Sequence, residues 1–203
     1  MSIIVALAVI GLILFIAFKY NQRNQEPELE DPASLLSKFL SNGNQLVLDD
    51  VLLFQEDRDK YFEKYEDEFY ECGIDGPDEI SLAGTFANAL IKSKTAICVD
   101  NRSDPHDVLE QLDELSGGQI TKAIGYSSLE KEFKNSKYGI GAYFDSIESS
   151  PTIFECINSI GLKLLSVDNG SDAYILVLIK TENLEECSAL AKQSGIRLFF
   201  EHK

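Results

Sequence analysis

The stretch that most constrains the fold of this chain is residues 95–115, TAICVDNRSDPHDVLEQLDEL. Residues 95–99 are β-branched or apolar and carry no charge, which predicts a buried strand. Residues 100–104 have turn chemistry, and Pro105 suits the first position of a helix. Apolar side chains then recur at helical spacing, at Val108, Leu109, Leu112 and Leu115. A helix that packs this face back on the strand predicts an α/β or α+β domain.

The C-terminal third predicts a hairpin, a helix and a final strand. Residues 162–167 and 173–179 are apolar runs on either side of residues 168–171, where an Asn-Gly pair favours a turn with positive φ. Residues 183–193 have a helical pattern, and residues 196–200 form a last apolar run. Together with the earlier strand and helix, these segments predict an α+β fold with a small mixed sheet of about four strands and packed helices.

Further helices are expected around these segments. Residues 45–54 fit a helix or a strand, and a helix is favoured because Asp49 and Asp50 would interrupt a buried strand. The other expected helices are residues 33–40, 80–91, 129–133, 138–149 and 151–160.

Residues 57–72 predict one amphipathic helix with an aromatic face and an acidic back. The aromatic face consists of Tyr61, Phe62, Tyr65, Phe69 and Tyr70. The acidic back consists of Glu63, Glu66, Asp67, Glu68 and Glu71. One hypothesis makes these five acidic residues an interaction surface for a basic partner, and the other makes them a solvated face without a partner.

Residues 2–18, SIIVALAVIGLILFIAF, contain no charged or strongly polar side chain. This pattern predicts a single transmembrane helix, and a secretory signal peptide is the competing interpretation. Lys19 and Arg23 follow the apolar run and nothing positive precedes it, so the domain is expected on the cytoplasmic side of the inner (plasma) membrane. The expected organisation is an anchor at 1–20, an acidic tether at 21–32 and an acidic α+β domain at 33–203.

The formal net charge is −16, from 34 Asp and Glu against 18 Lys and Arg. Such a surface repels phosphate backbones, so nucleic acid is not an expected partner, whereas a basic protein or a cation is compatible with it. The four cysteines form no C-x-x-C pair, which argues against a zinc ribbon or a redox motif, and most are expected to be buried thiols. Phosphate-loop, dinucleotide, zinc-protease and serine-hydrolase motifs are missing from the sequence, and no cofactor is expected.

The candidate ligand or metal site is the turn after residue 99. Asp100 and Asp104 offer carboxylate oxygens to a divalent cation, with His106 or Asp107 completing the set. The alternative is structural, because Asp104 can cap the following helix, Asp107 can complement its dipole and Arg102 can pair with an acid.

Two runs of sequence resemble a bacterial family of unknown function. The first, residues 97–118, has an apolar strand that ends at an acid, followed by a helix that stops at a Gly pair. The second, residues 160–196, contains a hairpin of the type L-x-x-x-D-x-G-x-D-x-Y, from Leu164 to Tyr174. Asn101 departs from the family pattern, which has an aromatic residue there. The resemblance covers about residues 33–200 and implies a fold without an activity.

These observations favour a membrane-anchored cytoplasmic domain that binds another protein, such as an immunity or adaptor protein without catalytic activity. A metal-dependent enzyme or ligand-binding domain that uses residues 100–107 stays open as an alternative. A structural component of an envelope complex is the third hypothesis.

Overall fold

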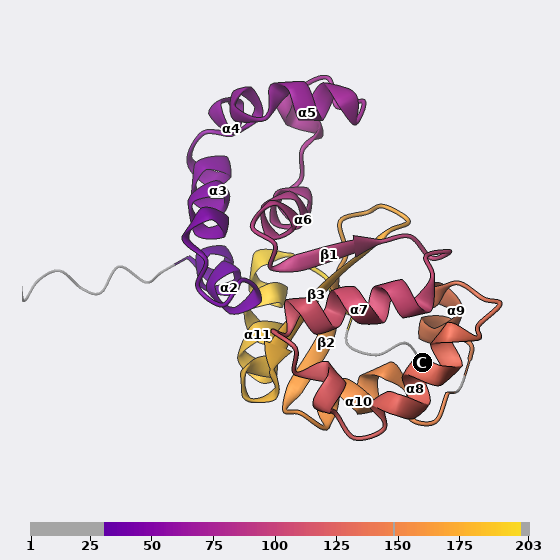
Figure 1. Cartoon of the computed structure of the whole chain (residues 1–203). Coiled ribbons are helices and arrows are strands. Elements are labelled where there is room, and N and C mark those ends of the chain that lie inside the picture. Colours follow the sequence, from indigo (N-terminus) through magenta and orange to yellow (C-terminus); the bar gives the residue numbers. More distant parts are fainter. Residues whose placement is uncertain (1–30, 148, 200–203) are drawn as a thin grey trace, which may run out of the picture. The chain divides into compact units, whose positions relative to one another are not determined.

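The computed structural model describes residues 31–147 and 149–199 (Figure 1). The expected anchor at 2–18 and the tether up to residue 30 lie outside the described residues. Within the described residues, 31–147 and 149–199, no helix is long and apolar enough to cross a membrane. The first helices are α2 (Pro32–Leu40), α3 (Gln45–Glu56), α4 (Arg58–Lys64), α5 (Glu66–Glu71) and α6 (Leu82–Lys92). The later helices are α7 (Pro105–Leu115), α8 (Tyr126–Lys134), α9 (Ile140–Asp145), α10 (Ile153–Asn158) and α11 (Leu184–Ser194).

The four strands of the described residues form one sheet in the order β1-β3-β2-β4. They are β1 (Ala96–Val99), β2 (Leu162–Val167), β3 (Tyr174–Lys180) and β4 (Leu198–Phe199). Every neighbouring pair is antiparallel, so the prediction of a mixed sheet was wrong. Helix α11 connects β3 to β4, which suggests a parallel pair, but β2 lies between these two strands. β3 and β4 therefore run in the same direction, but both pair with β2 and not with each other.

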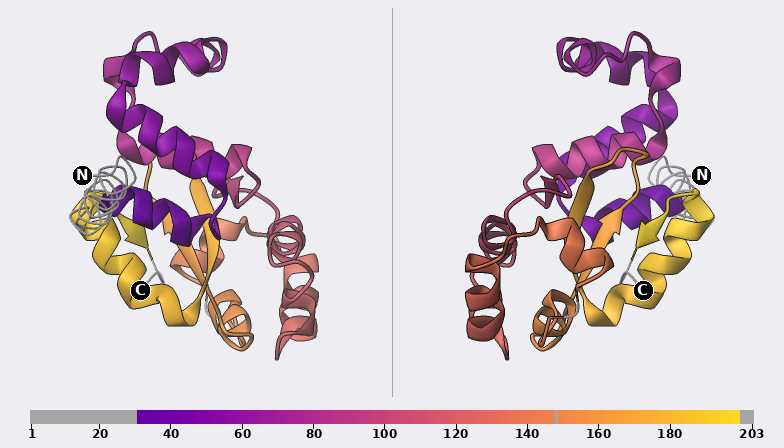
Figure 2. Two further views of the ribbon diagram at one scale, coloured as in Figure 1. Left: turned by 90° about the vertical axis from the view of Figure 1, so that its left-hand side faces the viewer. Right: turned by 90° about the vertical axis from the view of Figure 1, so that its right-hand side faces the viewer.

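Helices cover both faces of the sheet (Figure 2). One face carries Leu165, Val177 and Ile179, which pack in a cluster with buried residues of α2, α3, α6 and α11. The opposite face carries Leu164 and Leu178, which pack in a second cluster with residues of α7, α8, α9 and α10. Because β3 is buried on both faces, Tyr174–Ile179 form a continuous apolar run instead of an alternating one, whereas β2 includes Lys163 and Ser166.

The predicted strand, turn and helix of residues 95–115 are confirmed as β1 and α7. Val108, Leu109 and Leu112 are 0 % exposed and face the sheet. Burying one such side chain contributes about 1.5–3 kcal/mol. The helix begins where Asp104 accepts hydrogen bonds from the backbone N–H groups of His106 and Asp107. This packing fixes the direction of α7 and thus the place of its first polar turn.

The predicted single helix at 57–72 was wrong, because the chain breaks at Tyr65 into α4 and α5. Tyr65 has φ −126° and ψ 22°, outside the helical region. The break brings the rings of Phe62 and Phe69 into a stacked pair with centroids 5.6 Å apart. Ring packing thus accompanies the break, across which the Phe69 N–H still donates a hydrogen bond to the Tyr65 carbonyl. The expected aromatic face is confirmed for Tyr61, Phe62 and Phe69, which are buried, whereas Tyr70 is 50 % exposed.

Smaller differences occur elsewhere. Helix α9 is shorter than the expected 138–149, and α10 is capped by Thr152, which exchanges hydrogen bonds with Glu155 in a capping box. In the hairpin turn only Gly170 has positive φ among the Asn-Gly pair. Two cysteines are buried, Cys156 and Cys187, and two are exposed, Cys72 and Cys98, so the expectation that most are buried was wrong.

Candidate functional site

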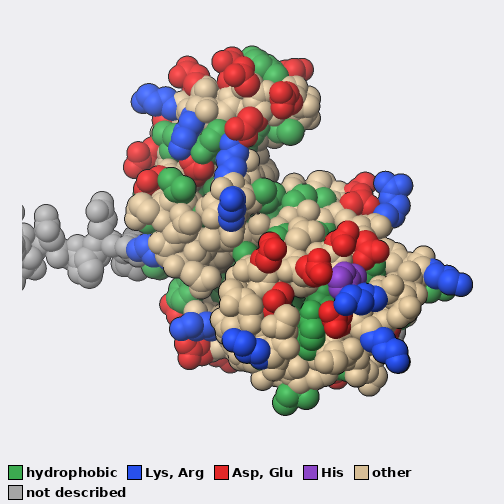
Figure 3. All heavy atoms as spheres, in the orientation of Figure 1, with side chains coloured by type: hydrophobic (Ala, Val, Ile, Leu, Met, Phe, Trp, Pro, Cys, Tyr) green, Lys and Arg blue, Asp and Glu red, His purple; other side chains and the backbone are tan. Residues whose placement is uncertain are grey.

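The last residue of α3 and most of the chain between α3 and α6 form an arm that lies apart from the sheet (Figure 1). We call residues 56–79 the acidic arm; they include α4, α5 and a short 3-10 turn at Pro77–Glu79. The arm holds eleven Asp or Glu and three Lys or Arg, a net charge of −8 and half of the total of −16. Acidic side chains accordingly gather over α4 and α5 on the molecular surface (Figure 3).

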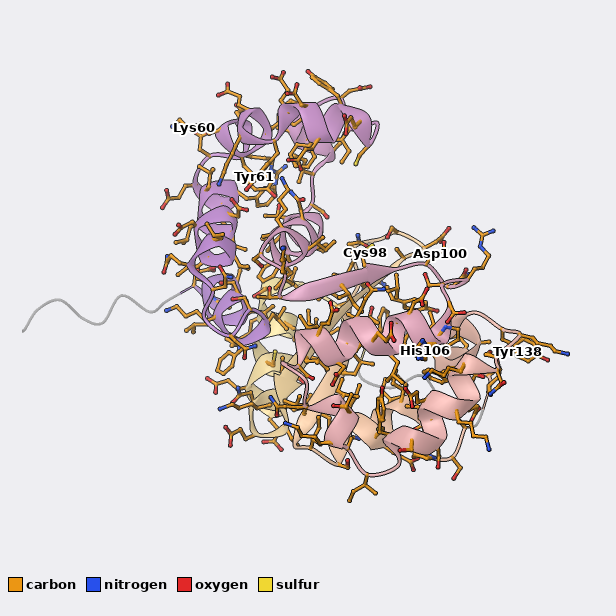
Figure 4. All side chains as sticks on the ribbon, viewed as in Figure 1. Lys60, Tyr61, Cys98, Asp100, His106 and Tyr138 are labelled. Atoms are coloured by element: carbon orange, nitrogen blue, oxygen red, sulfur yellow. The ribbon has the colours of Figure 1, made fainter. Side chains whose placement is uncertain are left out.

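The arm has its own hydrophobic cluster under this acidic surface. Its buried members are Phe54, Tyr61, Phe62, Phe69 and Ile80. Tyr61 is 0 % exposed and contacts the rings of Phe54 and Phe69 with centroids 5.7 and 5.8 Å away (Figure 4). Burial raises the pKa of Tyr61 above its ordinary value, so the hydroxyl stays neutral. Such aromatic contacts hold the acidic helices in one arrangement.

A buried carboxylate connects the arm to α3. Asp50, 3 % exposed, accepts a hydrogen bond from the Lys64 ammonium at 2.7 Å and another from the Tyr65 hydroxyl at 2.7 Å. Burial and then the hydrogen bond to Asp50 raise the pKa of Tyr65. The hydrogen bond to the same carboxylate raises the pKa of Lys64. Both partners of Asp50 lie at the junction of α4 and α5, so this group fixes the position of the helix break.

Lys92 of α6 fixes the second helix of the arm. Its ammonium lies 3.4 Å from the centroid of the Tyr65 ring and forms an ion pair with Glu68. Glu68, one of the five predicted interaction residues, is therefore used in part by the fold. Glu66 accepts a hydrogen bond from the Tyr70 hydroxyl at 3.2 Å, which raises the pKa of Tyr70.

The remaining predicted interaction residues are available for contact with another molecule. Glu63, Asp67 and Glu71 are exposed and make no ion pair or side-chain hydrogen bond with the described residues. All five predicted acidic residues are exposed, as expected of an acidic back. Sequence reasoning missed the supporting residues Asp50 and Lys92, because they lie on α3 and α6 and no local spacing connects them to the arm.

The second candidate is the turn that precedes α7. Asp100 accepts hydrogen bonds from the backbone N–H of Arg102 at 2.8 Å and from its guanidinium Nε at 3.2 Å, which lower the pKa of Asp100. Asp104 is the helix cap, so the structural alternative accounts for both of these carboxylates. The turn packs closely against the start of α9, since a Cβ at Gly139 or Gly141 would collide with Asn101.

The structure brings His106 and Asp107 together with Glu110, which sequence reasoning missed. One ligand atom from each of these three residues lies within 4.8 Å of the others. His106 Nε2 is 3.6 Å from Glu110 Oε1 and 3.9 Å from an oxygen of Glu130 on α8 (Figure 4). This nitrogen is buried and has no hydrogen-bond partner among the described residues. The spacing from 106 to 110 is one helical turn and could have revealed Glu110, whereas nothing local points to Glu130.

This geometry can hold a divalent cation, and Asp100 and Asp104 are not part of the group. An imidazole nitrogen beside two or three carboxylates suits Zn²⁺ or Mn²⁺ better than Ca²⁺, which prefers oxygen ligands alone. Lys134 competes for Glu130, because its ammonium lies 2.9 Å from the carboxylate and lowers the pKa of Glu130.

The described domain is thus a three-layer α+β protein with an antiparallel four-stranded sheet and a projecting acidic arm. Residues 33–201 match DUF6630, a domain of unknown function, and the chain belongs to this family. The match confirms the resemblance to a family of unknown function, over nearly the range expected. No curated protein and no solved structure matches the chain.

Proposed function

We propose that this chain is a non-catalytic protein-binding module that docks a basic surface of its partner on the acidic arm. The observation that supports this most is the concentration of charge, since the arm carries a net charge of −8 out of −16. Opposite charge at a binding surface accelerates association and selects between partners. A surface used only for solubility has no need of such concentration.

The packing beneath the acidic side chains also supports this proposal. Exposed carboxylates on a flexible loop would lose conformational freedom on binding, and this loss would weaken the complex. Here Glu63, Asp67 and Glu71 stand on two helices that are held by an aromatic cluster and by the buried Asp50. Tyr70, half exposed beside them, offers an aromatic contact of the kind that dominates many interfaces.

The sequence of residues 2–18 supports placing this module at the inner membrane, with the domain in the cytoplasm. An immunity or adaptor protein that neutralises a basic toxin at the membrane is one concrete form of this function. The proposal gives the arm the binding role and gives the N-terminal segment only the role of an anchor.

The test compares two variants of equal charge. In the arm variant Glu63, Asp67 and Glu71 become Lys, and in the control Glu114, Asp172 and Glu186 become Lys at exposed positions outside the arm. Full-length protein is used to capture partners from native membranes at low and at high salt, with identification by mass spectrometry. We expect a stoichiometric basic partner that is lost at high salt and with the arm variant but retained by the control. Equal loss with both variants, or no partner at all, would contradict the proposal.

A second candidate function is divalent-cation binding at His106, Asp107 and Glu110, because the buried Nε2 of His106 lies beside these carboxylates and has no hydrogen-bond partner in the part of the chain that the structure describes. A cation bound to the native state alone raises the melting temperature. We expect Zn²⁺ or Mn²⁺ to raise it in the wild type and in Asp100→Asn, and not in Glu110→Gln. An identical shift in Glu110→Gln would exclude this group as the ligand set.

A further inference from the structure

A polar pocket opens at the end of the sheet where β1 begins and β3 ends. Its volume is about 220 Å³. Its lining residues include three leucines, Leu115, Leu162 and Leu178, and two lysines, Lys94 and Lys180. No Asp or Glu is among the described residues that line it. A positively charged pocket is unexpected in a protein with a net charge of −16.

The backbone at this pocket is unusual. Asn42 and Lys94 are the two non-glycine residues with positive φ in the described part of the chain, at 52° and 57°, and both line this pocket. Lys94 is the second residue after α6, a position that glycine occupies after α5 and α7 as Gly73 and Gly117. A lysine in the left-handed region is strained where glycine is not. A lysine is therefore present at position 94 although the backbone conformation there favours glycine.

The charge of Lys94 is not needed to end its helix. The last carbonyl groups of α6, at Ala89, Leu90 and Ile91, already accept backbone hydrogen bonds from residues 93–95. The Lys94 ammonium itself makes no ion pair or hydrogen bond with the described residues. Lys180 has one distant partner, an oxygen of Glu182 at 3.7 Å, and both side chains are exposed. Two ammonium groups therefore remain available to a bound molecule.

We propose that this pocket binds a small organic anion with a short apolar body. The two lysines hold its phosphate or carboxylate group, and the leucines contact its hydrocarbon part. Asn42 and Gln119 also line the pocket, and the Asn42 amide and the Oε1 of Gln119, whose Nε2 donates to the Ser116 carbonyl, offer hydrogen bonds that orient the ligand. This site is independent of the acidic arm and of the first turns of α7.

The experiment titrates the full-length protein with butyl phosphate and with hexanoate, followed by amide NMR. n-Butanol and inorganic phosphate are titrated as controls, because they represent the apolar half and the anionic half of butyl phosphate. We expect shifts at residues 94, 95, 178 and 180, and weaker binding of each half than of butyl phosphate. The comparison of butyl phosphate with hexanoate tells whether the anion is a phosphate or a carboxylate. If neither probe shifts these residues at millimolar concentration, the proposal is wrong.

Variants separate binding from structure. Lys94→Gly removes the ammonium and the backbone strain together, so we expect a higher melting temperature without ligand and at least tenfold weaker binding. Lys180→Gln is expected to weaken binding to a similar extent. Lys137→Gln changes the charge equally at an exposed position away from the pocket and is expected to bind like the wild type. Unchanged affinity in both pocket variants, or equal loss in Lys137→Gln, would overturn the site.

Discussion

The acidic arm and the sheet body, meaning the other described residues, are stabilised in different ways. The two clusters of the body contain 19 and 17 buried apolar residues on opposite faces of the sheet, against five in the cluster of the arm. The body uses mainly aliphatic side chains, whereas the arm uses aromatic rings in pairwise contact. One buried carboxylate, Asp50, adds a polar connection at the arm that the body does not require.

Because of this difference, the stability of the sheet body and the stability of the acidic arm depend on different contacts. Regions with few buried contacts open locally at lower free energy than the global transition. We therefore expect the arm to open locally at a lower free energy than the sheet body. The concentrated acidic charge thus lies on the less stable of the two regions. Each prediction below tests whether a change acts on one region or on both.

The largest effect is expected for Phe133→Ala in the body. Phe133 is 1 % exposed, and its ring centroid lies 4.6 Å from that of Tyr143. We expect the free energy of unfolding to fall by about 3–5 kcal/mol, because a large cavity remains under α8. Urea unfolding followed by circular dichroism measures this loss. Leu46→Ala, at a position that is 64 % exposed, is the control and should change stability by less than about 0.5 kcal/mol.

A smaller and local effect is expected for Asp50→Ala. The hydroxyl of Tyr65 and the ammonium of Lys64 lose their acceptor, at a cost of about 1–3 kcal/mol. Amide hydrogen exchange should accelerate in α4 and α5 and stay unchanged in β2 and β3. Asp49→Ala, at the exposed neighbouring position, is the matched control. Equal acceleration in the sheet would show that the arm does not open separately.

A cap variant should affect α7 alone. Asp104→Ala removes the acceptor of two backbone N–H groups, which costs about 1 kcal/mol. The loss should be seen as a lower denaturation midpoint, and Asp104→Ser should restore most of it. No effect on the hydrogen exchange of α4 and α5 is expected. An Asp104→Ala protein as stable as the wild type would mean that the cap is not needed.

The mildest test uses thiol chemistry and changes no residue. Cys72 at the end of α5 is exposed, whereas Cys187 is buried in the body, where burial raises its pKa from 9.0 to about 12. A reagent for thiolates at pH 8 should label Cys72 quickly and leave Cys187 unmodified in native protein. Mass spectrometry of the peptides measures both rates.

The same pKa predicts a dependence of stability on pH. Burial raises the pKa of the Cys187 thiol from 9.0 to about 12, so folding favours its neutral form. The contribution is fully present below pH 9 and is lost as pH rises toward 12. Replacement of Cys187 by Ala should remove this alkaline loss, and an unchanged pH profile would contradict the assignment.

Local patterns in the sequence predicted most of the elements, because helix and strand periods depend on neighbouring residues. β1, the hairpin of β2 and β3, and the helices α2, α3 and α6 are examples. The break at Tyr65 was missed because it depends on Asp50 and Lys92, which are distant in sequence. The strand directions were mistaken because a helical connection can pass over an intervening strand.

The candidate sites likewise divide into those that local sequence predicts and those that depend on residues distant in sequence. The exposed acids of the arm and the cap at Asp104 follow from local sequence, and the structure places them as expected. Glu130 and the pocket with Lys94 and Lys180 depend on elements that meet only in the folded chain. Their spacing in the sequence carries no signal.

The place of β3 at the centre of the sheet has a consequence for synthesis of the chain. β3 pairs with both β1 and β2, yet it consists of Tyr174–Lys180 and follows nearly all of the helices. While a ribosome is still making residues before 174, the apolar faces of α2, α6 and α7 have no complete sheet to cover. Such nascent chains expose surface that attracts chaperones or other unfolded chains. Folding of this domain therefore waits for one late strand, and a chain interrupted before it leaves two sets of helices without the layer that joins them.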